Sequence, residues 1–138
     1  MSTQTKTAPA PVDRRSPRIL VVDDERSMRE LMAIVLRREG YDVLLAENGR
    51  SAIDLLQREP VDLLISDIKM PDEDGYALMR SLRSAGISTP AIALTAFARR
   101  EDADEARAAG FQVHLAKPVD SRLLVDAAAQ LLESGSVH

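Results

Sequence analysis

The alternation of short apolar runs with longer stretches of helical periodicity is the feature that most restricts how this 138-residue chain can fold. Strands and helices that alternate along a chain are typical of βαβ units, in which a helix joins two parallel strands. Right-handed crossovers leave few ways to arrange such units, so the pattern predicts an open, doubly wound α/β sheet. The five runs expected to form strands are Ile19–Val22, Val43–Ala46, Val61–Ile65, Ala91–Leu94 and Val113–Ala116.

The composition of these runs predicts their places in the sheet. The first, third and fourth runs are apolar at nearly every position, which is typical of strands covered by helices on both faces. The second run is short, and His114 interrupts the fifth. We therefore expect the second and fifth strands at the two edges.

Five stretches between and after the runs have the features of helices. The first carries an apolar stripe that ends at Gly40, a typical position for a helix C-terminus. The fourth is lined mainly by alanine, so it is expected to bury little area. The apolar stripe of the first helix consists of Met28, Leu31, Met32, Val35 and Leu36. The other helices are expected between Asn48 and Pro60, at Tyr76–Ser84, at Arg99–Ala109 and at Ser121–Glu133, with Asn48 and Asp120 as caps of the second and the last. The inward face of the fourth helix is expected to carry Ala103, Ala106 and Ala109.

The length and the proline content predict one domain with a short tail at each end. Residues 1–17 contain three prolines and little apolar periodicity, so they are expected to form a flexible N-terminal tail. Residues 18–133 are expected to form the domain, and residues 134–138 a C-terminal tail.

The composition excludes several classes of function. A net charge of −4 gives no broad attraction to nucleic acid or to anionic lipid. The absence of cysteine excludes disulfides and thiolate chemistry, and two histidines are too few for a structural zinc site. No apolar run approaches the ~20 residues that span a bilayer, and the N-terminus has no hydrophobic signal core. We expect a cytoplasmic protein with no nucleic-acid or membrane partner.

Polar residues follow the predicted strands at the points where they end. Asp23 and Asp24 follow the first, Asp67 the third, Thr95 the fourth and Lys117 the fifth. The carboxyl ends of parallel strands meet at one edge of the sheet, where doubly wound folds bind ligands. Two carboxylates about 4 Å apart repel by on the order of 4 kcal/mol at an effective dielectric of 20, so the cluster needs a proton or a cation. Oxygen ligands of this kind suit Mg²⁺ or Mn²⁺.

These residues resemble the motifs of the receiver domain of bacterial response regulators. The resemblance covers residues 18–133 and rests on four motifs in order: Asp23-Asp24, Asp67–Pro71 followed by Gly75, Thr95-Ala96, and Lys117-Pro118. It implies a flavodoxin-like sheet of five parallel strands in the order 2-1-3-4-5 with five helices.

The resemblance also implies a phosphoacceptor and a metal site. Asp67 would take a phosphoryl group from the phosphohistidine of a histidine kinase or a histidine phosphotransfer protein. Asp24, Asp67 and the backbone carbonyl of Lys69 would bind Mg²⁺ directly, and Asp23 would act mainly through water. The protein would catalyse only its own phosphorylation and dephosphorylation, so it would not be an enzyme with an external substrate.

A further set of residues would bind the phosphoryl group and transmit the signal. Lys117 would pair with the group, and Thr95 would follow it with its hydroxyl while Ala96 leaves room. His114 occupies the switch position, where receivers more often have Tyr or Phe. Lys117 and Pro118 would be joined by a cis peptide. Phosphorylation would then change a surface that binds a downstream protein target.

The same residues also allow purely structural interpretations, and two other functions are compatible with the predicted fold. Taken singly, the Asp pair could cap a helix, Thr95 could merely end a strand, and Lys117 could be a surface residue. A small aspartyl-phosphate phosphatase usually has a second Asp two residues after the nucleophile, where this chain has Lys69. A flavodoxin-like cofactor binder would need a glycine-rich loop after the first strand, and none is present.

The end of the sequence indicates how a signal would be passed on from the domain. The chain ends at His138, five residues after the last predicted helix, so we expect no C-terminal DNA-binding domain. Residues 110–119 are similar to receivers attached to hybrid sensor kinases, while the opening methionine suits a free-standing protein. The sequence leaves both arrangements open.

Overall fold

Five parallel strands form one sheet in the order β2-β1-β3-β4-β5, as the receiver resemblance implies. This computed structural model describes residues 16–71, 74–96 and 100–136. From β1 the chain first adds β2 on one side of the sheet and then β3, β4 and β5 on the other. This change of direction places a crevice at the carboxyl ends of the two central strands, β1 and β3. The strands are β1 (Arg18–Val22), β2 (Asp42–Ala46), β3 (Leu63–Asp67), β4 (Ala91–Thr95) and β5 (Val113–Ala116).

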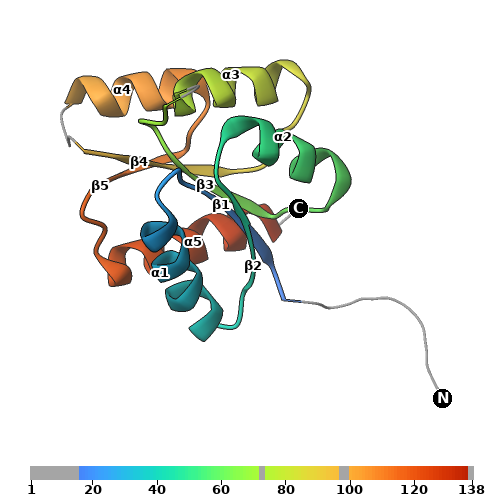
Figure 1. Ribbon diagram of the computed structural model, residues 1–138, viewed down its shortest axis with the longest axis vertical. Coiled ribbons are helices and arrows are strands. Elements are labelled where there is room, and N and C mark those ends of the chain that lie inside the picture. Colours follow the sequence, from blue (N-terminus) through green and yellow to red (C-terminus); the bar gives the residue numbers. More distant parts are fainter. Residues whose placement is uncertain (1–15, 72–73, 97–99, 137–138) are drawn as a thin grey trace.

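Helices cover both faces of the sheet (Figure 1). The side chains packed on one face come from α1 and α5, and those on the other from α2, α3 and α4. This is the doubly wound arrangement that the alternating pattern predicts. The helices are α1 (Arg26–Arg38), α2 (Gly49–Arg58), α3 (Gly75–Ser84), α4 (Arg100–Ala109) and α5 (Ser121–Ser136).

The burial of the strands confirms their predicted places. β3 and β4 are buried at every position and β1 at all but its first, whereas the edge strands β2 and β5 are only partly buried. The predicted bounds of the third strand are wrong by two residues, because β3 begins at Leu63 and continues through Ser66 and Asp67. The ladder is formed by the backbone, so two polar residues can extend a strand beyond its apolar run.

The predicted apolar stripe of α1 is correct except at Leu31. Met32 and Leu36 are buried, but Leu31 is 54% exposed. The third buried residue of α1 is Ala33, whose small side chain did not mark it as part of an apolar stripe in the sequence. The helix ends as predicted, with Gly40 at a φ of +92°, a conformation that glycine adopts without steric cost.

The side-chain caps predicted for two other helices are present. Asn48 Oδ1 accepts a hydrogen bond from the Ser51 amide at 2.8 Å, and Asp120 Oδ1 accepts one from the Arg122 amide at 2.8 Å. The last helix extends to Ser136, three residues beyond the predicted Glu133. A glycine in its final turn lowers helix stability by only about 1 kcal/mol and does not prevent the extension.

Helix α4 buries little, in agreement with its alanine content. Ala106 and Ala109 are buried, whereas Ala103 is only half-buried. Its C-terminal end is held to the preceding helix by Arg83, whose guanidinium donates to the Gly110 carbonyl at 2.7 Å and to the Ile87 carbonyl at 2.9 Å.

Three of the sequence predictions fall wholly or partly on residues that the structure does not describe. The N-terminal tail lies outside the described residues up to position 15, Arg99 lies outside them, and so does the end of the C-terminal tail at 137–138. Within the described ranges, none of the helices combines the length and apolarity needed to cross a bilayer.

Candidate functional site

The parallel register brings three predicted carboxylates together at one edge of the sheet. Val22 pairs with Ser66, so the residues that follow them, Asp23 and Asp67, end neighbouring strands side by side. One carboxylate oxygen from each of Asp23, Asp24 and Asp67 lies within 4.8 Å of the others. The convergence expected from the sequence is therefore present in the structure.

Asp23 is the most enclosed member of this acidic cluster. Its side chain is 0% exposed, and Oδ1 accepts a hydrogen bond from the Glu25 amide at 2.8 Å. Oδ2 is buried and has no hydrogen-bond partner among the described residues. Burial raises the pKa of Asp23 above its ordinary value, and the Glu25 amide and the Lys117 charge only partly offset this effect.

Lys117 supplies a positive charge to the cluster from the end of β5. Its Nζ lies 2.9 Å from Asp67 Oδ2 and 3.5 Å from Asp23 Oδ2, so the first contact is a hydrogen-bonded ion pair and the second a longer ion pair. Burial lowers the pKa of Lys117, but the hydrogen bond to Asp67 and the two carboxylate charges outweigh it, and the net pKa is raised. One ammonium against three carboxylates leaves two negative charges uncompensated.

The residues predicted to follow the phosphoryl group lie beside this cluster. Thr95 is the last residue of β4 and is buried, and its carbonyl accepts a hydrogen bond from the Lys117 amide at 2.7 Å. Ala96 comes next and is exposed at the rim. The peptide bond between Lys117 and Pro118 is cis, as the resemblance implies.

His114 lies on the sheet face that carries α4. It pairs with Ala93, which belongs to the apolar cluster beneath α3 and α4, and side chains of paired residues in a parallel ladder point to the same face. The ring is half-buried, and its Nε2 is buried without a hydrogen-bond partner among the described residues. Its place is compatible with the predicted switch position.

The main chain around Asp67 is held from several sides. The Lys69 amide approaches Asp67 Oδ1 at 3.3 Å, and the Ser66 hydroxyl donates to the Asp67 carbonyl at 3.0 Å. The next residue, Ile68, donates its amide to the Leu94 carbonyl at 2.9 Å and accepts from the Gly75 amide at 2.7 Å. The Lys69 main chain therefore lies at the cluster, and its carbonyl as a metal ligand stays a prediction.

The cluster has the chemistry that a hard divalent cation requires. It offers carboxylate oxygens from two strand ends, a residual negative charge, and in Asp23 Oδ2 a buried acceptor without a hydrogen bond among the described residues. Mg²⁺ binds through one or two carboxylates and keeps several waters. The residues present therefore fit Mg²⁺ or Mn²⁺.

Arg29 contacts the cluster, although the sequence patterns did not single it out. Its Nη1 donates to the Asp23 carbonyl at 2.7 Å. Its partner is a backbone carbonyl, which has no side-chain signature in the sequence, and Arg26 in the same turn pairs within the helix instead.

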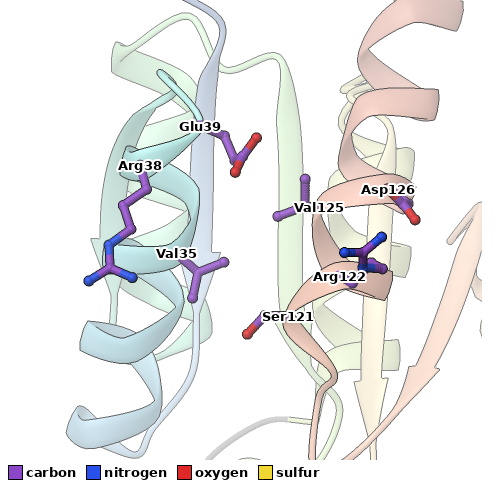
Figure 2. A pocket seen from close by; sticks show the side chains of 7 residues that line it. All are labelled: Val35, Arg38, Glu39, Ser121, Arg122, Val125 and Asp126. Carbon is purple, nitrogen blue, oxygen red and sulfur yellow. The ribbon is translucent and has the colours of Figure 1, made fainter.

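A separate groove of about 360 Å³ lies between α1 and α5 and contains none of the predicted site residues. In Figure 2, Val35 on α1 and Val125 on α5 lie between the two helices, and the lining of the groove also includes charged side chains of both signs. The charged residues are Arg38, Glu39, Arg122 and Asp126. The acidic cluster, which gathers the predicted residues, is therefore the candidate site.

The sequence matches the response regulator receiver domain family over residues 19–129. With the sheet order and the acidic cluster already described, this match shows that the chain belongs to the response regulator receiver family. Receiver domains act in two-component signalling, together with histidine kinases and downstream effectors.

Individual relatives agree with this assignment. The chain is 46% identical over 109 residues to an uncharacterised 14.6 kDa protein of Leptolyngbya boryana, covering 78% of this chain and 83% of that protein. It is 37% identical over 118 residues to the transcriptional regulatory protein GlrR of Escherichia coli, covering 86% of this chain but only 27% of GlrR. The receiver domain of Francisella response regulator 1452 superposes with a TM-score of 0.83 at 28% identity, covering 86% of this chain and 98% of that domain.

Asp23→Asn is expected to stabilise the metal-free fold at neutral pH. An acid whose pKa is raised on folding destabilises the folded state when it is ionised, so the neutral amide should raise the free energy of unfolding. The gain should shrink as the pH falls through the raised folded pKa toward the unfolded value of 3.8, where both states are protonated. Urea unfolding in EDTA at several pH values measures it, and a gain that grows at low pH would contradict this prediction.

Proposed function

We propose that this chain is the phosphoacceptor receiver of a two-component or phosphorelay system and that Asp67 is the residue phosphorylated. The observation that carries the proposal is the setting of Asp67. Its carboxylate is 4% exposed, lies in a cluster of three carboxylates and forms a 2.9 Å ion pair with Lys117. The Asp67 carboxylate can act as an oxygen nucleophile, and the Lys117 ammonium beside it can stabilise the negative charge of an incoming phosphoryl group.

The proposed step transfers a phosphoryl group from a phosphohistidine to Asp67. A carboxylate oxygen of Asp67 forms the new O–P bond while the P–N bond breaks, and the departing imidazole keeps the electron pair and takes up a proton. The Lys117 ammonium, already 2.9 Å from Asp67 Oδ2, stabilises the negative charge brought by the phosphoryl group. The product is an aspartyl phosphate, and no other reactant is needed.

A cation in the acidic cluster would assist this step. Asp24, Asp67 and the Lys69 carbonyl would hold Mg²⁺, with Asp23 acting mainly through water. The ion would supply neutralisation of the phosphoryl charge, which accounts for much of the catalysis in phosphoryl transfer. Mn²⁺, which prefers similar ligands, would substitute for it.

The output would pass through the strands next to the site. The Thr95 hydroxyl would bond the new phosphoryl group, Ala96 would leave it room, and His114 would adjust on the α4 face. The carbonyl of Thr95 accepts a hydrogen bond from the Lys117 amide, so a displacement of the end of β4 would also displace the end of β5. The surface changed in this way would bind a downstream protein target in the cytoplasm.

An aspartyl-phosphate phosphatase is the less favoured function. Such enzymes usually carry a second Asp two residues after the nucleophile as acid and base, and Lys69 in that position counts against turnover. The proposed chain therefore catalyses only its own phosphorylation and dephosphorylation.

Incubation with acetyl phosphate and Mg²⁺ tests the proposed function. Intact-mass analysis should show one added phosphoryl group that survives acid and is removed by mild base, as an acyl phosphate is. Omission of Mg²⁺ with added EDTA should prevent its formation. Fast release of phosphate over many turnovers would favour the phosphatase, and the absence of any adduct would contradict the proposal.

A further inference from the structure

The contact between Arg29 and the acidic cluster is made to the main chain. Arg29 Nη1 donates to the carbonyl oxygen of Asp23 at 2.7 Å, within the usual range for a strong N–H···O hydrogen bond. Arg29 is half-buried, and its side chain makes this hydrogen bond while its backbone amide donates to the Glu25 carbonyl at 3.1 Å. The guanidinium therefore acts on the backbone of the cluster rather than on a carboxylate.

The carbonyl that Arg29 holds belongs to the peptide unit between Asp23 and Asp24. The peptide group is planar, so fixing its carbonyl fixes the direction in which the chain leaves Asp23 and enters Asp24. Both residues are predicted to serve the metal, one through water and one directly. The orientation of this peptide unit is therefore one determinant of the separation of their carboxylates.

Two other hydrogen bonds hold Asp23, and neither is made to its carbonyl oxygen. The Asp23 amide donates to the Ala46 carbonyl at 3.2 Å, and Asp23 Oδ1 accepts from the Glu25 amide at 2.8 Å. These bonds fix the residue on its N-terminal side and fix its carboxylate. Glu25 at the start of α1 makes no side-chain cap, so the turn from β1 into α1 is held by the Asp23–Glu25 bond and by Arg29.

We propose that Arg29 is a positioning residue for the metal site: it sets the spacing of the Asp23 and Asp24 carboxylates by holding the peptide unit between them. The inference rests on the proposed function, since it concerns the cation of that site. Groups that orient metal ligands without touching the metal typically change metal affinity by about 10- to 100-fold when removed.

The sign of the effect separates positioning from simple electrostatics. Arg29 is a cation near a cation site, so removal of its charge alone should tighten the binding of Mn²⁺ by reducing repulsion. Loss of positioning should weaken binding instead. The two roles of Arg29 therefore predict opposite changes for a neutral replacement.

The matched control is Arg26, three residues earlier in α1. Its side chain is 81% exposed and pairs with Glu30 at 2.9 Å, with no contact to the cluster recorded in the structure. Arg26→Met removes the same charge from the same turn of the helix. It therefore reports the effect of charge without the effect of the hydrogen bond.

The experiment measures Mn²⁺ binding to the full chain by the electron paramagnetic resonance signal of the free ion. Arg29→Met should weaken binding by about 10- to 100-fold, and Arg29→Lys should lose less because it keeps a donor and the charge. Arg26→Met should leave binding unchanged or slightly tighter, because its exposed charge is already paired with Glu30. Circular dichroism in EDTA verifies that each variant is folded at the temperature used. Arg29→Gln is the second neutral variant, for use if Arg29→Met is not folded.

Two results would overturn the inference while leaving the proposed function intact. The first is binding by the neutral Arg29 variants as tight as, or tighter than, that of the wild-type chain. The second is equal weakening in Arg26→Met. Absence of Mn²⁺ binding by the wild-type chain would instead remove the proposed metal site, and with it the basis of the inference.

Discussion

Asp67→Asn is expected to abolish the phosphoryl adduct completely. The amide that replaces the carboxylate is neutral and has no oxygen able to form an acyl phosphate under these conditions. Asn has nearly the volume of Asp, so the 4% exposed position should remain filled. Intact mass after incubation with acetyl phosphate and Mg²⁺ should show only the unmodified chain.

The same variant should fold normally, which separates loss of the nucleophile from loss of structure. Asp67→Asn removes one of three mutually repelling carboxylates, and Lys117 keeps a contact with Asp23 at 3.5 Å. Its unfolding free energy in EDTA should therefore be close to that of the wild-type chain. Urea unfolding followed by circular dichroism measures this quantity.

Asp74→Asn is the matched control for Asp67→Asn. Asp74 is exposed, and its Oδ1 caps α3 by accepting from the Ala77 amide at 2.8 Å. Asn caps helices about as well as Asp, so this control should fold and gain the phosphoryl group at the wild-type level. A base-labile adduct on Asp67→Asn would show that another residue is the acceptor.

The sequence predicted the architecture because its main determinants are local. The alternating apolar runs fix the order of elements, and Asn48 and Asp120 mark two helix starts by hydrogen bonds to their own neighbours. The convergence of Asp23 and Asp67 follows from the topology, since parallel strands end at a common edge. The helix starts need no knowledge of distant contacts, whereas the order of the strands within the sheet came from the receiver resemblance.

Other features depend on packing between distant segments, and the sequence did not show them. Leu31 is apolar but lies on the solvent side of α1, because the position of the sheet decides which part of an apolar stripe is buried. Arg29 matters through a backbone carbonyl, which carries no side-chain signature. The Gly75 position is a third case, since the space around it is set by the end of β3.

Gly75→Ala is expected to destabilise the fold and to impair phosphorylation together. A Cβ at position 75 would lie 2.6 Å from the carbonyl oxygen of Asp67 and 2.9 Å from the Cα of Ile68. Both are backbone atoms at the end of β3, so neither can move aside as a side chain would. The start of α3 and the end of β3 must separate, which strains the 2.7 Å hydrogen bond from the Gly75 amide to the Ile68 carbonyl.

The sign of this effect is opposite to that expected from helix propensity. Ala is more favourable than Gly inside a helix by up to about 1 kcal/mol, so an uncrowded first helical position would gain stability. Overpacking of a close contact costs about 1 to 3 kcal/mol. A net loss of about 1 to 2 kcal/mol is therefore expected in urea unfolding, and a gain in stability would show that the contact relaxes.

Gly40→Ala separates the two consequences of Gly75→Ala. Gly40 has a φ of +92°, and no atom beyond Gly40 and its two chain neighbours lies within 4 Å of the place that a Cβ would occupy, so the substitution should cost about 1 to 2 kcal/mol through backbone strain alone. Gly75→Ala moves the residue that carries the nucleophile, and a misplacement of this kind can lower a rate by about tenfold or more. We therefore expect similar losses of stability in the two variants but slow phosphorylation by acetyl phosphate only in Gly75→Ala, and equal rates would mean that Gly75 serves the fold and not the geometry of Asp67.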